Sequence, residues 1–150
     1  MKTALTLLFA MLLSAAPGWA VLGEYENSVA TDQQVMRGQV RAMARQGYSL
    51  HEITAPGRMV VREFVAPSGR VFGVAWSGST MPNLKQLLGS YFTDFQKGAR
   101  KQRSLRGPRQ PVVLRSKKLV VVSGGHMRSF SGMAYVPDLV PGNVSAEVVR

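Results

Sequence analysis

Two tight-turn signals separate three short apolar runs between Tyr48 and Trp76, and this segment constrains the fold more than any other. Residues 55–58 read Ala-Pro-Gly-Arg, which places Pro and Gly at the central positions of a type II turn. Residues 66–69 read Ala-Pro-Ser-Gly, which suits a type I turn closed by a glycine bulge. The flanking runs are rich in Val and Phe. The pattern therefore predicts an antiparallel meander with strands over 48–53, 59–65 and 70–76.

The second turn also predicts how its two strands pair. If Ala66 faces Arg70, then Phe64 faces Phe72 and Val60 faces Trp76, and cross-strand partners point to the same face of the sheet. The residues expected on this core face are Val60, Phe64, Phe72, Val74 and Trp76, with Arg62 as the one misfit.

A helix is predicted after Asn83, which can cap it, and Gln86 completes a capping box. Its apolar residues recur at three- and four-residue steps, and we expect them to pack on the aromatic face of the meander. They are Leu84, Leu87, Leu88, Tyr91, Phe92 and Phe95. Inside a helix Gly89 would cost about 1 kcal/mol relative to Ala.

Shorter strands are predicted over 112–114, 119–122 and 130–136, with a Gly-Gly hairpin turn at 124–125 and an irregular tail after Pro137. The fold class expected is α+β, in which an antiparallel sheet is formed by the three-strand meander and the C-terminal hairpin. One amphipathic helix packs on one face of that sheet.

The first 20 residues have the pattern of a cleavable signal peptide. Lys2 precedes an apolar run over 4–13, which is too short to span a membrane, and small residues suit cleavage after Ala20. The alternative is an uncleaved anchor or an N-terminal core helix. The expected product is exported to the periplasm or the extracellular space, with no transmembrane segment after cleavage.

Residues 21–47 are predicted to be a basic peripheral segment, either a linker or a short helix, ahead of a single domain over 48–150. Thr31 would cap that helix, and Gly47 would end it. Three arginines four residues apart would share one helical face: Arg37, Arg41 and Arg45.

The chain contains no cysteine, which excludes disulfides, a lipid anchor on cysteine, cysteine zinc sites and thiol nucleophiles. It has 19 Lys and Arg against 8 Asp and Glu; without Lys2 the counts are 18 and 8, a net charge of +10. Such a charge favours anionic partners through long-range attraction. The partners expected are anionic lipid, lipopolysaccharide or acidic polysaccharide.

The cations concentrate between Lys97 and Lys118, a stretch without acids that is predicted to be mostly a connecting loop because Gly107, Pro108 and Pro111 interrupt helices. It also lacks aromatic residues, so nothing indicates base stacking or specific nucleic-acid binding. The candidate anion-binding residues are Lys97, Arg100, Lys101, Arg103, Arg106, Arg109, Arg115, Lys117 and Lys118.

No catalytic residue, metal site or cofactor is predicted. A zinc site would need His51, His126 and a carboxylate, yet the adjacent His51 and Glu52 would point to opposite faces of a strand. Ser123 and His126 lack a nucleophile elbow. Two alternatives to an anion-binding protein stay open. One is a hydrolase acting on envelope material near His51, Glu52 and His126. The other is a structural module that binds an unknown protein partner through a sheet edge or apolar face.

Several short blocks, in order, resemble the Domain of Unknown Function 2844 family of bacterial exported proteins, whose function is uncharacterised. The resemblance implies export and a single shared domain, and no activity. The blocks are residues 48–53 (YSLHEI), 61–65 (VREFV), 69–76 (GRVFGVAW), 81–84 (MPNL), 86–92 (QLLGSYF), 119–127 (LVVVSGGHM) and 130–135 (FSGMAY).

Overall fold

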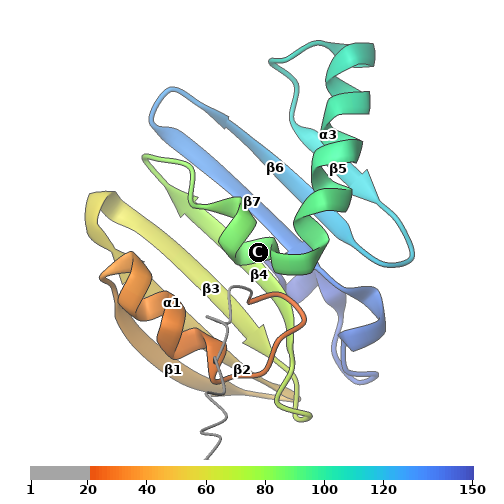
Figure 1. Ribbon diagram of the computed structural model, residues 1–150. Coiled ribbons are helices and arrows are strands. Elements are labelled where there is room, and N and C mark those ends of the chain that lie inside the picture. The colour runs from red at the N-terminus through yellow and green to blue at the C-terminus, as the bar shows by residue number, and fades with distance from the viewer. Residues whose placement is uncertain (1–20) are drawn as a thin grey trace, which may run out of the picture.

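A seven-stranded antiparallel sheet runs through the centre of the computed structural model, which describes residues 21–150 (Figure 1). The strand order is β1-β2-β3-β4-β7-β6-β5. The predicted signal peptide over 1–20 lies outside the described residues. The strands are β1 (Gln39–Arg45), β2 (Tyr48–Ala55), β3 (Met59–Val65), β4 (Val71–Gly78), β5 (Val112–Arg115), β6 (Val120–His126) and β7 (Ser129–Tyr135).

The chain builds this sheet from both edges towards the middle. Strands β1 to β4 form a meander, so the predicted three-strand unit is present and gains β1 as an outer strand. The helical segment then carries the chain to the opposite edge, from which β5, β6 and β7 return until β7 pairs with β4. The fold is α+β as predicted, and the C-terminal hairpin belongs to the same sheet, which is larger than expected.

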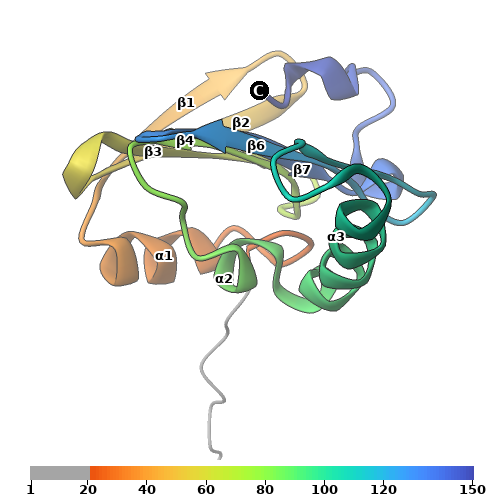
Figure 2. The same cartoon turned by 90° about the horizontal axis from the view of Figure 1, so that it is seen from above.

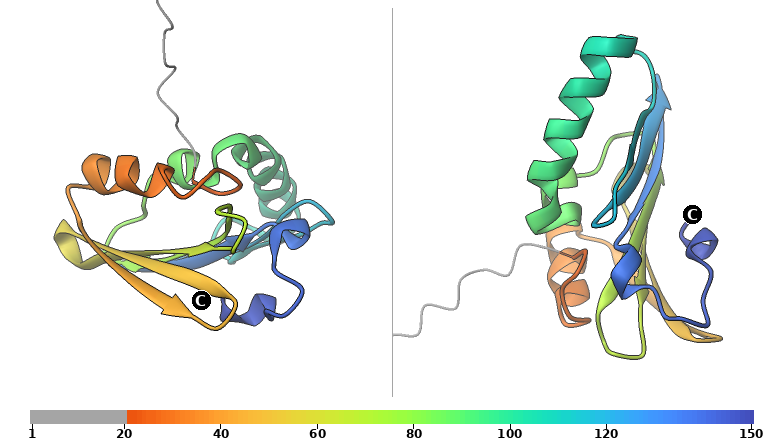
Figure 3. Two further views of the ribbon diagram at one scale, coloured as in Figure 1. Left: turned by 90° about the horizontal axis from the view of Figure 1, so that it is seen from below. Right: turned by 90° about the vertical axis from the view of Figure 1, so that its right-hand side faces the viewer.

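Helices cover one face of the sheet and the C-terminal segment covers part of the other (Figures 2 and 3). The helical layer contains α1 (Ser28–Met36), α2 (Leu84–Leu88), the 3-10 turn η2 (Gly89–Tyr91) and α3 (Phe92–Arg106). The tail has only two 3-10 turns, η3 (Pro137–Leu139) and η4 (Ala146–Val148), and its irregular character was predicted. It nevertheless buries Val149 against the sheet.

A β-bulge changes the predicted pairing of β3 and β4. The turn itself is as predicted, because Ala66 N donates to Arg70 O at 2.8 Å. Beyond it the register shifts, so that Phe64 pairs with Gly73 rather than with Phe72. An extra residue in one strand moves the following side chains to the opposite face.

The predicted common core face is therefore wrong. Phe64 and Phe72 lie with Tyr48 under the C-terminal segment, whereas Val74 and Trp76 belong to the core beneath the helices. The helices thus pack on a mainly aliphatic face that includes Trp76, and not on the cluster of phenylalanines. Arg62, the apparent misfit, pairs across the strands with Glu52, its Nε donating to Oε2 at 2.8 Å.

The segment before Gly47 packs into the fold and is not a peripheral linker. It contains a short helix, as predicted, but α1 ends at Met36 and strand β1 follows it. Val21 and Leu22 are fully buried, and Leu22 N donates to Leu87 O at 3.1 Å. Helix α1 begins before Thr31, which is therefore not its cap. Strand β1 holds two of the three arginines expected to share one helical face, and Gly47 serves the β1–β2 turn.

The long helix predicted after Asn83 is interrupted at Gly89. The Asn83 side chain does cap its first turn, accepting from Gln86 N at 3.3 Å. Gly89 has φ 49° and ψ −123°, a conformation that L side chains rarely adopt, so α2 ends and α3 starts in a new direction. This break lets Leu87 and Leu88 enter the core while α3 runs towards β5 (Figure 1).

The predicted Gly-Gly turn is wrong as well, because Gly124 and Gly125 lie within β6 and the hairpin turns at Met127 and Arg128. These glycines provide space. A β-carbon at Gly125 would come within 2.6 Å of Phe130 Cδ1, and one at Gly124 within 3.2 Å of Pro111 Cβ. Close packing therefore explains why two glycines occur here, whereas turn preferences alone predicted that the chain would reverse direction at them.

Changing Gly89 to Ala tests the helix break. A continuous helix would gain about 1 kcal/mol from this change, whereas the observed positive φ predicts a loss of at least about 1 kcal/mol. Urea unfolding followed by circular dichroism measures the difference. Ser90→Ala, at the neighbouring exposed position, is the control and should change stability little. A more stable G89A protein would contradict the break.

Candidate functional site

Residues 97–118, here called the basic lobe, form one structural unit at the β5 edge of the sheet (Figure 1). Its first ten residues continue α3, so the predicted connecting loop is confined to 107–111. Gly107 ends the helix with φ 87°. All nine candidate cations are exposed, and none takes part in either of the two ion pairs found within residues 21–150.

Side-chain contacts hold α3 against β5. Gln102 Oε1 accepts from Val113 N at 2.8 Å, and its Nε2 donates to Pro111 O at 3.3 Å. Gly98 allows the helix to approach closely, since a β-carbon there would lie 2.8 Å from Leu114 Cδ1. The cations are therefore displayed on a packed helix and strand instead of a free loop.

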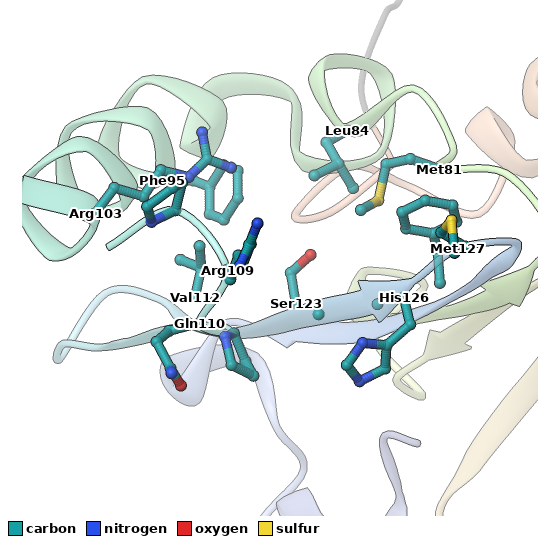
Figure 4. Close-up of a pocket in the computed structure, with 15 residues that line it drawn as sticks. Met81, Leu84, Phe95, Arg103, Arg109, Gln110, Val112, Ser123, His126 and Met127 are labelled. Carbon is teal, nitrogen blue, oxygen red and sulfur yellow. The ribbon is translucent and has the colours of Figure 1, made fainter. Parts of the chain in front are cut away.

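A groove of about 780 Å³ opens between α3, the loop before β5 and the β6–β7 hairpin (Figure 4). We call it the α3–hairpin groove. Its walls are mainly apolar, and two of the nine candidate cations, Arg103 and Arg109, lie on it. The apolar residues that line it include Met81, Leu84, Phe95, Val112, Met127 and Phe130.

The groove does not assemble a serine hydrolase from Ser123 and His126. Both residues belong to β6, three positions apart, so they lie on opposite faces of the strand. Figure 4 shows the Ser123 hydroxyl pointing into the groove and the His126 imidazole pointing away from it. A general base must reach its nucleophile, and this histidine does not.

The other residues considered for catalysis are also separated. His51 Nε2 lies 2.9 Å from Glu26 Oε1, whereas Glu52 pairs with Arg62. Strand β2 carries His51 and Glu52, and three other strands separate it from β6, the strand of His126. Across the described chain, no group of three or more His, Asp or Glu side chains is placed to hold a metal ion.

Sequence reasoning missed a buried polar cluster between the helices and the sheet. Asp32 on α1, Glu63 on β3 and Gln86 on α2 are all buried, and Glu63 is fully shielded from solvent. Gln86 Nε2 donates to Asp32 Oδ1. This contact explains why the polar side chain of Gln86 is buried.

Ionising both carboxyl groups in this buried position costs free energy, because each charge loses hydration and the two charges repel each other. Burial raises the pKa of Glu63 to about 9, and the nearby charge of Asp32 adds to the shift. Burial likewise raises the pKa of Asp32, to about 6. Asp32 Oδ2 and both Glu63 carboxyl oxygens have no hydrogen-bond partner among residues 21–150.

One signal in the sequence could have revealed this cluster. Glu63 alternates with Val61 and Val65 in a strand whose face is otherwise apolar, which marks a buried acid. Its partner Asp32 could not be found because it comes from a distant helix.

The buried pair predicts that stability falls as pH rises. Above pH 4.5 the unfolded chain releases the Glu63 proton, whereas the folded protein keeps it until about pH 9. The free energy of unfolding should therefore decrease across this window by up to about 1.4 kcal/mol per pH unit. Glu63→Gln, which keeps the shape without the acid, should flatten this slope and stabilise the protein at pH 8.

Urea unfolding at pH 5, 7 and 9 measures both slopes. Glu24→Gln, which removes an exposed acid, is the matched control and should retain the wild-type slope. If E63Q and the parent protein have parallel pH profiles, Glu63 is not held protonated.

The comparisons with known proteins concern the family alone. No curated protein and no solved structure matched the chain.

Among the helices of residues 21–150, none combines the length and the hydropathy that a membrane span requires. The family model described as "Protein of unknown function (DUF2844)" matches residues 18–149, nearly the whole chain. The chain therefore belongs to the DUF2844 family.

Proposed function

We propose that this is an exported envelope protein, periplasmic or extracellular, that binds an anionic surface through its basic lobe. The observation that carries the proposal is the display of nine exposed cations on α3, the following loop, β5 and the β5–β6 turn, with no acid in the same stretch. Within the described part of the chain none of them is neutralised by an ion pair.

The physical basis is long-range attraction. Cations near a negatively charged membrane contribute about 1 kcal/mol each, and salt screens that attraction. Leu105 is 75% exposed between Arg103 and Arg106, which adds an apolar side chain suited to the boundary between headgroups and acyl chains. Anionic lipid, lipopolysaccharide and acidic polysaccharide all offer the required charge.

Co-sedimentation of the purified protein with vesicles tests this proposal. We expect binding to phosphatidylglycerol-containing vesicles, little binding to phosphatidylcholine vesicles, and loss of binding at high salt. Changing Arg100, Lys101 and Arg106 to Gln should weaken binding at least tenfold, because three surface contacts of about 1 kcal/mol each are removed.

The matched control removes the same charge elsewhere, by changing Arg41, Arg45 and Lys85 to Gln; all three are exposed. Equal losses in the two triple variants would reduce the effect to net charge. Salt-insensitive association with one protein would instead favour the structural module that binds a protein partner.

A further inference from the structure

The α3–hairpin groove has an apolar interior and a cationic mouth. Arg103 projects from α3 and Arg109 from the loop before β5, and Figure 4 shows both beside the space opposite Ser123. No Asp or Glu of the described chain lines the groove. A ligand there would meet apolar walls along its length and positive charge at one end.

We propose that this groove binds a single anionic amphiphile of the fatty-acid type, with its carboxylate at Arg103 and Arg109 and its alkyl chain along the apolar wall. The volume of about 780 Å³ falls in the range of small-molecule sites. Guanidinium groups can bind a carboxylate through two parallel hydrogen bonds, which a diffuse positive surface does not provide.

The rim of the groove suits a flexible aliphatic chain. Met127 at the tip of the β6–β7 hairpin is 95% exposed, and Met81, on the segment between β4 and α2, is 41% exposed. Methionine side chains are unbranched and adapt to irregular apolar ligands. Phe95 and Val112 are already buried and form a fixed floor.

Charge decides between this occupant and a second copy of the protein. Another copy brings the same excess of cations, 19 against 8 acids in the full chain, and would be repelled from a mouth lined by two arginines. A neutral apolar ligand would leave both guanidinium groups without a counter-charge. An anionic amphiphile satisfies the apolar wall and the cationic mouth together.

Ligand binding in the groove does not require the basic lobe to bind a surface. Two double variants distinguish ligand binding from surface binding. Arg103→Gln with Arg109→Gln removes the charges at the groove. Lys101→Gln with Arg106→Gln removes two charges from the same lobe that do not line it. Vesicle binding should fall equally in both double variants, whereas ligand binding should fall only in the first.

Isothermal titration with decanoate below its micellar concentration is the test. We expect the R103Q/R109Q protein to bind at least tenfold more weakly than the parent, and the K101Q/R106Q protein to stay within about twofold. Octanoate should bind about 15-fold more weakly than decanoate, from about fourfold per methylene. Acetate should not bind measurably. Circular dichroism confirms that each variant is folded.

Three outcomes would overturn the proposal. Absence of decanoate binding to the parent protein removes it directly. Equal weakening in both double variants assigns binding to diffuse charge on the lobe. Equal affinity for decanoate and the neutral decyl glucoside shows that the arginines do not recognise an anionic head.

Discussion

The pairing of β4 with β7 is the contact on which the rest of this molecule depends. It joins the N-terminal meander to the strands that return from the opposite edge, and it makes β4 an interior strand, buried from Val71 to Trp76. The join is tight because Trp76 lies over Gly132, where a β-carbon would come within 2.3 Å of the indole ring. Because Gly132 has no side chain, the indole ring of Trp76 can lie over it without a clash.

That pairing also creates the candidate sites. Because β7 must end beside β4, the chain first crosses to the far edge through α2 and α3, and the break at Gly89 directs α3 towards β5. The basic lobe is the end of this crossover, and the α3–hairpin groove is the space between it and the β6–β7 hairpin. The binding surface and the binding groove therefore both arise from this crossover, and Arg103 and Arg109 belong to both.

The buried acids lower the stability of the fold when they are ionised. Asp32, Glu63 and Gln86 lie where α1, α2 and the sheet meet, and Glu63 is buried with both carboxyl oxygens unpaired in the described structure. Replacing such a group by an apolar one often leaves stability unchanged or improves it. The cluster instead makes the stability of the contact between helices and sheet depend on the protonation of Glu63.

Local sequence was enough wherever the determining contacts are short-range. The turns at 55–58 and 66–69, the cap at Asn83, the lack of cysteine and the run of cations were all read from neighbouring residues. Tertiary structure decided the bulge beside Phe64, the inclusion of residues 21–47, the interruption at Gly89 and the position of the Gly124-Gly125 pair in a strand. Each of these depends on side chains from distant segments. The strand through Gly124 and Gly125 places Ser123 and His126 on opposite faces. The packing of α3 against β5 brings Arg103 and Arg109 to one groove, which no local pattern encodes.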